Sequence, residues 1–124
     1  MATMINLNDK TSLGLFNIVS GVYQIENIRN NRVYIGQSNN IMYRIAGHVD
    51  HLYGERHSCS EMQDDFLEYG IGAFEFRVLE RVSGNVKDLL DMENEYIISY
   101  LINGFNLYNK VSSLRIEARK YLRT

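Results

Sequence analysis

The chain has 124 residues, of which 45% are apolar and 23% charged, and these values are typical of one small globular domain rather than of a disordered chain. The formal net charge is −2, from 13 basic and 15 acidic residues, which excludes a polybasic nucleic-acid binder. The charge is unevenly distributed, because residues 58–95 carry three basic and ten acidic side chains whereas residues 96–124 carry five and one. Any contact with phosphates should therefore be local.

The sequence offers no sign of a membrane or an export pathway. No apolar stretch approaches the roughly 18 residues that would span a bilayer. The N-terminus lacks the basic start and the apolar stretch of a signal peptide. The single cysteine, Cys59, excludes an internal disulfide and fits a reducing compartment. We therefore expect a cytoplasmic protein with no membrane partner.

The first predicted elements form a hairpin. Residues 1–19 have weak periodicity and are an N-terminal extension that could add a strand or cover a sheet edge. Residues 20–27 (SGVYQIEN) and 32–38 (RVYIGQS) are rich in valine, isoleucine and tyrosine, as β-strands are. The asparagine-rich IRNN between them favours a hairpin turn. Tyr23 and Tyr34 should therefore lie on paired neighbouring strands.

Helices make up most of the remaining chain. Serine or asparagine residues that can cap a helix stand before the first two, and Gly70 stands where the second should end. The candidate caps are Ser38, Asn39 and Asn40 for the first helix, and Ser58 and Ser60 for the second. The predicted elements are helices at 40–55, 58–70, 85–102 and 113–124, a strand at 73–82 and a loop at 103–109. The order ββααβαα predicts an α+β fold with a small sheet packed against helices.

The predicted helix 85–102 carries a carboxylate in an unexpected place. Its apolar residues recur at helical spacing, and Glu93 lies in the middle of their stripe. The stripe consists of Val86, Leu89, Leu90, Ile97, Tyr100 and Leu101, and the acids expected on the opposite, solvated face are Asp88, Asp91 and Glu95. A carboxylate on a buried face is costly unless it is paired. Glu93 could form a structural ion pair with Arg44 or Arg77, or it could bind Mg²⁺, which often takes one or two carboxylates and water.

A second cluster of polar residues lies on the predicted helix 40–55. Arg44, His48 and His51 are spaced by four and three residues, so they share one face. His57 and Cys59 follow, and three histidines with a cysteine could hold zinc, although the spacing H-x₂-H-x₅-H-x-C matches no established zinc pattern. Such histidines are more often solvated or hydrogen-bonded. An arginine one turn from a histidine also suits a phosphate site, because arginine offers a fixed fork of donors.

Taken together, these residues resemble the motif of a known nuclease family. The segment GVY at 21–23 followed by YIG at 34–36 is similar to the GIY-YIG motif, with valine in place of isoleucine at position 22. Further polar residues follow in the same order, namely Arg44, His48, His57, Glu93 and Asn106 of INGFN. The resemblance covers residues 20–109 and is most similar to the catalytic domains of phage homing endonucleases. It leaves 1–19 as an extension and 110–124 as a basic C-terminal helix.

The resemblance implies a small three-stranded antiparallel sheet flanked by helices, and an endonuclease that hydrolyses double-stranded DNA with one Mg²⁺ or Mn²⁺. Tyr23 would activate the attacking water with help from Tyr34 or His48, and Arg44 would hold the scissile phosphate. Glu93 would bind the metal ion. The family also implies that His57 and Asn106 orient the substrate or support the site, and that Gly21 and Gly36 keep the strand surface open beside the tyrosines.

The proposed base has one chemical difficulty. A free tyrosine has a pKa near 10, so it is a poor base at neutral pH unless a nearby cation or a basic histidine lowers that value. A bound metal ion, Arg44 and His48 could supply this effect.

Target recognition and catalysis each have alternatives. The tail residues Arg115, Arg119, Lys120 and Arg123 could contact phosphates, which position DNA without reading its sequence. Specificity would then come from a homodimer, from a separate DNA-reading partner or from a longer parent protein. A non-catalytic DNA- or partner-binding module that keeps the fold is the main alternative to an enzyme. A zinc-stabilised interaction domain built on the three histidines and Cys59 is another.

Overall fold

The computed structural model describes residues 3–5 and 19–110. Within them the helices and strands follow the predicted order. The elements are β1 (Thr3–Ile5), β2 (Gly21–Asn27), β3 (Arg32–Ser38), α2 (Ile41–Tyr53), α3 (Ser60–Tyr69), the 3₁₀ turn η1 (Ile71–Ala73), β4 (Phe74–Arg81) and α4 (Val86–Ile102). The basic helix predicted at 113–124, with its four DNA-contact candidates Arg115, Arg119, Lys120 and Arg123, lies outside the described residues.

The sheet is antiparallel, and its strands lie in the order β1-β4-β2-β3. The predicted three-stranded antiparallel sheet is confirmed as β4-β2-β3. The short strand β1 extends it by pairing with the outer edge of β4, so part of the N-terminal extension does add a strand. The IRNN segment forms the tight connection of the β2–β3 hairpin, where Asn31 adopts a positive φ of 63°. Asparagine tolerates that conformation better than most residues.

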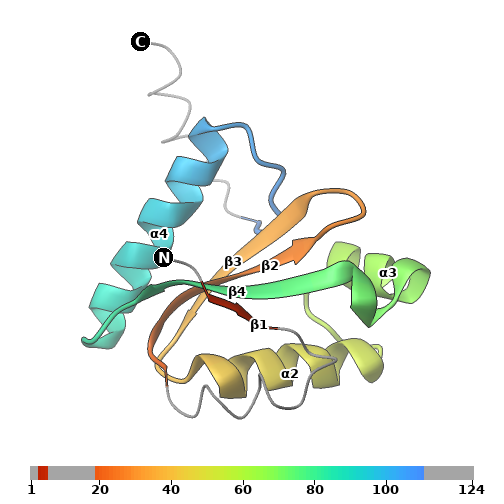
Figure 1. Cartoon of the computed structure of the whole chain (residues 1–124), viewed down its shortest axis with the longest axis horizontal. Helices are drawn as coiled ribbons and strands as arrows, with labels where there is room; N and C mark the ends of the chain where they lie inside the picture. Colours follow the sequence, from red (N-terminus) through yellow and green to blue (C-terminus); the bar gives the residue numbers. More distant parts are fainter. Residues whose placement is uncertain (1–2, 6–18, 111–124) are drawn as a thin grey trace.

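Helices cover both faces of the sheet, which gives three layers (Figure 1). One core contains Tyr23, Ile25 and Phe76 of the strands together with Ile41, Ile45 and Leu52 of α2 and Met62 and Phe66 of α3. The other core contains Val22, Val33 and Ile35 of the strands together with Ile97 of α4. Successive residues of a strand point to opposite faces, so Tyr23 belongs to the α2 side and its neighbour Val22 to the α4 side.

The helix ends follow local chemistry. Asn40, one of the three predicted candidates, caps α2 through a hydrogen bond from the Tyr43 backbone N–H. At α4, Asn85 and Asp88 form a reciprocal capping box. The predicted caps Ser58 and Ser60 of α3 are wrong, because the capping position is Cys59 and no side chain bonds the helix N-terminus there. Gly70 ends α3 with a φ of 79°, as expected.

The apolar stripe of α4 is shorter than predicted. Leu89 and Ile97 are buried, whereas Val86 and Leu90 are 66% and 43% exposed. The first turn of the helix therefore contributes little to the core. Asp88, Asp91 and Glu95 are exposed, as predicted, and Glu93 is half-buried.

Among the helices of the described residues, none combines the length and the apolarity that crossing a membrane requires.

Candidate active site

The two motif tyrosines project from neighbouring strands toward α2. In the β2–β3 ladder Tyr23 lies opposite Gly36, and Tyr34 lies opposite Ile25. The centroids of the two phenol rings are 6.4 Å apart. A Cβ added at Gly36 would lie 2.4 Å from both Cζ and Oη of Tyr23, so the ring of Tyr23 crosses β3 where a side chain is absent. The expectation that Gly36 keeps space beside a tyrosine agrees with this contact.

Gly21 serves a different purpose from the one expected. Its φ is 156°, and a Cβ there would lie 2.0 Å from the backbone oxygen of Glu80 on β4. The absence of a side chain therefore allows two strand backbones to approach. A register shift follows at once, because Val22 pairs with Glu80 whereas Tyr23 pairs with Val78. Gly21 thus belongs to an irregularity in the β2–β4 pairing that lies just before Tyr23.

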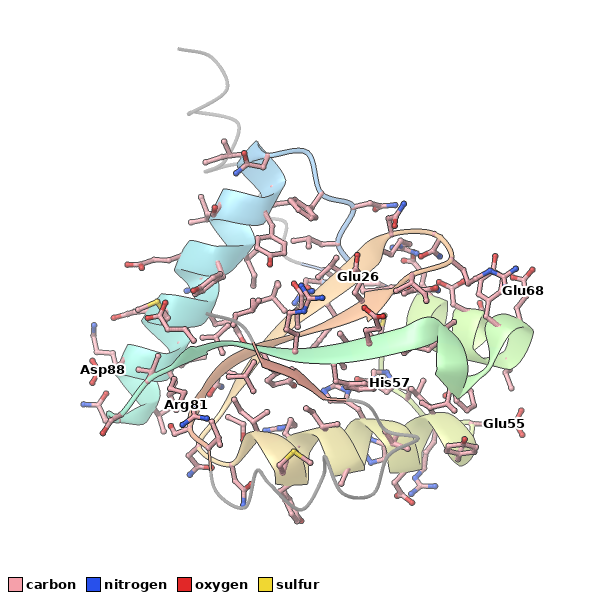
Figure 2. All side chains as sticks on the ribbon, viewed as in Figure 1. Glu26, Glu55, His57, Glu68, Arg81 and Asp88 are labelled. Carbon is pink, nitrogen blue, oxygen red and sulfur yellow. The ribbon has the colours of Figure 1, made fainter. Side chains whose placement is uncertain are left out.

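Two histidines from different segments meet the Tyr23 hydroxyl. His48 of α2 places Nε2 2.8 Å from Tyr23 Oη, and its Nδ1 lies 2.7 Å from Nε2 of His57. His57 precedes α3 and lies between α2 and the sheet (Figure 2). The rings of the two histidines are stacked with centroids 5.0 Å apart, and the ring of Tyr34 packs edge-on against His48 at 5.2 Å. Tyr23, Tyr34, His48 and His57 therefore form one continuous cluster.

Burial determines the ionisation of this cluster. Desolvation, reinforced by the neighbouring His57, Arg44 and His51, lowers the pKa of His48 to about 3. Desolvation followed by His51 lowers the pKa of His57 as well. Both imidazoles are therefore neutral at pH 7.

The pKa values of the two phenols are raised, whereas a base that works at neutral pH requires a lowered pKa. Desolvation raises the pKa of Tyr23 well above its usual value, Tyr34 and Glu93 add to the increase, and Arg44 opposes it. Desolvation and Glu93 also raise the pKa of Tyr34. Each phenol is therefore protonated at neutral pH in the free domain.

Glu93 lies close enough to both tyrosines to raise their pKa values, although its helix covers the other face of the sheet. β3 is the last strand of the sheet, and the carboxylate lies against its outer edge, where the Gln37 backbone N–H hydrogen-bonds it. Electrostatic interaction with Tyr23, Tyr34 and Arg44 shows that the acid is near all three. Burial raises the pKa of Glu93, and the Gln37 amide followed by Arg44 opposes that shift.

The predicted alternative of a structural ion pair has no partner among the described residues. Within 3–5 and 19–110, no cation lies within 4 Å of the Glu93 carboxylate. Arg77 approaches Glu75 instead, at 3.9 Å. Arg44 is an exposed residue of α2 and carries its charge beside the cluster without a carboxylate partner in the described residues. A half-buried acid and a nearby exposed guanidinium are therefore left available to a ligand.

The rest of the β3 edge is covered by the segment after α4. The Val33 N–H donates to the Asn106 carbonyl at 3.0 Å, and Ile35 exchanges two hydrogen bonds with the Asn109 side chain, at 2.9 and 2.8 Å. Asn106, predicted to orient substrate or support the site, contributes its backbone here, while the residue itself is exposed. Asn109 was not predicted. Both asparagines lie in the predicted loop 103–109, and nothing in the sequence distinguishes the one whose side chain holds the strand.

The zinc alternative receives no support from this arrangement. Among the described residues, no three side chains of histidine, cysteine, aspartate or glutamate converge in a way that could hold a metal ion. His51 is exposed, and its ring lies edge-on to that of His57 with centroids 6.4 Å apart. The Cys59 backbone N–H donates to His57 Nδ1, and its thiol lies 3.9 Å from the Tyr108 carbonyl. These histidines are joined by hydrogen bonds and ring contacts instead.

Comparison with known proteins agrees with this geometry. Residues 19–106 match the family described as the GIY-YIG catalytic domain. Over 90 residues the chain is 33% identical to intron-associated endonuclease 1 of Enterobacteria phage T4, covering 71% of this chain and 36% of that protein. The chain thus spans about a third of the length of this curated relative.

Two solved structures share the fold. The catalytic domain of the homing endonuclease I-TevI superposes with a TM-score of 0.64 at 32% identity, covering 74% of this chain and 98% of that one. A mutant of the I-TevI catalytic domain gives a TM-score of 0.63, also at 32% identity, over 72% of this chain and 93% of that one. The family and the structural neighbours support nuclease activity. This chain belongs to the GIY-YIG catalytic domain family of nucleases.

Proposed function

We propose that the chain is a divalent-metal-dependent endonuclease domain that hydrolyses phosphodiester bonds of double-stranded DNA. The observation that carries the proposal is the convergence of Tyr23, hydrogen-bonded to His48, with the half-buried Glu93 and the exposed Arg44 at one edge of the sheet. The groups come from β2, α2 and α4. Such a set provides a proton acceptor, an ion ligand and a phosphate binder, the groups that hydrolysis of a phosphodiester requires.

In this proposal Tyr23 first loses its phenolic proton to solvent and then, as the phenolate, accepts a proton from the attacking water. Its buried hydroxyl is held by His48, and Tyr34 packs beside it, so its position is fixed before substrate binds. Burial opposes ionisation of Tyr23, which means that the free domain is a poor catalyst. A single Mg²⁺ or Mn²⁺ held by Glu93 and water would polarise the phosphate oxygens and offset the effect of burial on Tyr23.

Arg44 binds the scissile phosphate in this proposal. Its guanidinium belongs to an exposed position of α2, one turn from His48, and has no carboxylate partner among the described residues. Arginine can donate two parallel hydrogen bonds to phosphate oxygens. The charge that develops on phosphate oxygens during hydrolysis would therefore be stabilised at this position.

The metal assignment fits the donor chemistry of the site. A half-buried carboxylate whose pKa is raised by desolvation gains from a bound cation, because the cation replaces the hydration that burial removes. Mg²⁺ accepts oxygen ligands and retains several waters, so one carboxylate can suffice.

The substrate and partners follow from the relatives. The similar proteins are named as a homing endonuclease and an intron-associated endonuclease of a phage, and we propose DNA as substrate and a phage-encoded origin for this domain as well. Target recognition would use a separate DNA-reading partner or part, or a homodimer. The tail residues Arg115, Arg119, Lys120 and Arg123 remain proposed phosphate contacts.

The test is cleavage of a supercoiled plasmid in the presence of Mg²⁺. The wild-type domain should nick or linearise the plasmid, and Glu93→Ala and Tyr23→Phe should each lose about 10²–10⁴-fold in rate. Both variants must retain the thermal unfolding transition of the wild type. Cleavage by Glu93→Ala at the wild-type rate would refute the proposed metal site. DNA binding without cleavage by the wild type would favour the non-catalytic alternative.

A further inference from the structure

A chain of hydrogen bonds begins at a backbone amide and ends at Tyr23. The Cys59 N–H lies 3.0 Å from His57 Nδ1, His57 Nε2 lies 2.7 Å from His48 Nδ1, and His48 Nε2 lies 2.8 Å from Tyr23 Oη. These contacts join the start of α3, the middle of α2 and the strand β2. Only in the contact between Cys59 and His57 is the donor known from chemistry alone, because it is a backbone N–H. This contact determines which nitrogen donates in the other two hydrogen bonds.

The backbone amide fixes the tautomer of His57. A backbone N–H can only donate, so His57 Nδ1 must accept and carries no proton. Burial keeps His57 neutral, as the lowered pKa indicates. A neutral imidazole has one proton, and it must therefore reside on Nε2. That proton points at Nδ1 of His48, which lies 2.7 Å away.

The same reasoning then fixes His48. Its Nδ1 accepts from His57, so its single proton resides on Nε2. His48 is also neutral, since burial, reinforced by electrostatic interaction with His57, Arg44 and His51, lowers its pKa. The Nε2–H group of His48 must therefore donate to Tyr23 Oη, and the tyrosine accepts.

The geometry points to His57 as a positioning residue that, held by the Cys59 amide, keeps His48 in the Nε2–H tautomer so that His48 donates to Tyr23. As regards catalysis, this inference rests on the proposed function. It excludes His48 as the group that takes the Tyr23 proton, because the nitrogen facing Tyr23 already carries one. The phenolic proton of Tyr23 is then directed away from His48. Once that proton has been lost to solvent, the phenolate oxygen keeps a donor that stabilises its charge.

Nuclear magnetic resonance tests the tautomers directly, without any substrate. Long-range ¹H–¹⁵N correlation spectra distinguish imidazole nitrogens that carry a proton from those that do not, and His51→Gln helps to assign the signals as a control at an exposed position. We expect both His48 and His57 to be neutral at pH 7 with the proton on Nε2. A proton on Nδ1 of His48, or a charged His48, at that pH overturns the inference.

Two nearly isosteric variants separate a hydrogen-bonding role from a packing role. His57→Gln can present an amide N–H to His48 Nδ1, whereas His57→Met fills a similar volume and cannot. We expect His57→Gln to keep the Nε2–H tautomer of His48 and most of kcat. In His57→Met, the proton of His48 should no longer be confined to Nε2. This variant should lose about 10- to 100-fold in kcat with KM unchanged, as when the hydrogen-bond partner of a functional histidine is removed. Equal kcat values for the two variants overturn the inference.

A third variant removes only the first donor. Cys59→Pro deletes the amide N–H, and the φ of −90° at this capping position lies about 25° from the value that proline prefers. The His57 signals should then show a population with a proton on Nδ1, and unchanged tautomers would contradict the relay even if His57→Met did not fold. If the wild type failed to cleave DNA while the predicted tautomers were observed, the proposed function would fail and the hydrogen-bond relay would stand.

Discussion

The ring of Tyr23 occupies the place that a side chain of Gly36 would take. The two residues are directly opposed in the β2–β3 ladder, and a methyl group at position 36 would lie 2.4 Å from the phenol oxygen. Tyr23 is 1% exposed and receives its hydrogen bond from a histidine of another layer, so it has little freedom to move aside. The glycine of the second motif half therefore determines the position of the tyrosine of the first half.

Gly36→Ala should displace the Tyr23 ring and impair catalysis. Overpacking of this kind costs about 1–3 kcal/mol of unfolding free energy. We expect a lower denaturation midpoint in urea and a loss of plasmid cleavage larger than the loss of folded protein explains. Gly72→Ala is the matched control, because a Cβ at Gly72 meets nothing within 4 Å. Equal cleavage by the two alanine variants would contradict the proposed steric role.

Glu93→Gln should stabilise the metal-free domain while abolishing cleavage. Burial raises the pKa of Glu93, so its stabilising contribution is present below pH 4.5 and is lost as pH rises through the higher folded-state value. The ionised acid therefore destabilises the fold at neutral pH, and the neutral amide removes that cost. Thermal unfolding of the wild type and Glu93→Gln without divalent ions tests whether the substitution stabilises the domain. A lower Tm for Glu93→Gln than for the wild type would contradict this prediction.

Mg²⁺ or Mn²⁺ should raise the Tm of the wild type through binding to the folded state. The stabilisation reaches about 2.7 kcal/mol when the free ion is at about 100 times its Kd. Glu93→Gln should lose this dependence, because an amide oxygen is a weaker ligand for a hard cation than a carboxylate. Ca²⁺-free and chelator-treated samples serve as the baseline. An equal rise in Tm for the wild type and Glu93→Gln would mean that the ion binds at a site without Glu93.

The unfolding free energy should decrease as the solution is acidified from pH 6.5 toward about 3. Burial lowers the pKa of His48 from 6.5 to about 3, so below pH 6.5 the unfolded chain binds a proton that the folded chain does not. The slope contributed by His48 is at most about 1.4 kcal/mol per pH unit. The lowered pKa of His57 also makes the unfolding free energy decrease on acidification. Urea titrations across this range should show a shallower slope in His48→Gln.

Arg44→Lys should lose most of the cleavage activity while keeping the fold. Lysine retains the positive charge but replaces a planar fork of donors with a point charge. Because Arg44 is an exposed residue of α2, its replacement should alter stability by less than about 0.5 kcal/mol. The measurement is the rate of plasmid nicking at saturating protein. Arg56→Lys, in an exposed ion pair with Asp50, provides a control. Full activity of Arg44→Lys would remove its phosphate role.

Sequence patterns located the secondary structure well where each pattern is local. The valine- and tyrosine-rich strands β2 and β3, the amphipathic α4 and the alternating β4 appear within a few residues of the predicted bounds. A strand from the N-terminal extension was predicted only as one of two alternatives, and the cap of α3 was predicted wrongly. Strand β1 has three residues and exists through pairing with β4, and the capping position of α3 is Cys59 rather than a serine. Short elements carry too few residues for a period to emerge.

The sequence by itself determined which residues each element presents, because helical and strand periods are properties of neighbouring residues. It therefore pointed to the two tyrosines, the arginine and histidine of α2, and an acid within an apolar helix face. Only the tertiary structure decided that Glu93, at the outer edge of β3, lies near the tyrosines, and that His57 rather than His51 contacts His48. Such approaches depend on strand register, on the missing side chain at Gly36 and on the packing of separate layers, and none of these is a property of the local sequence.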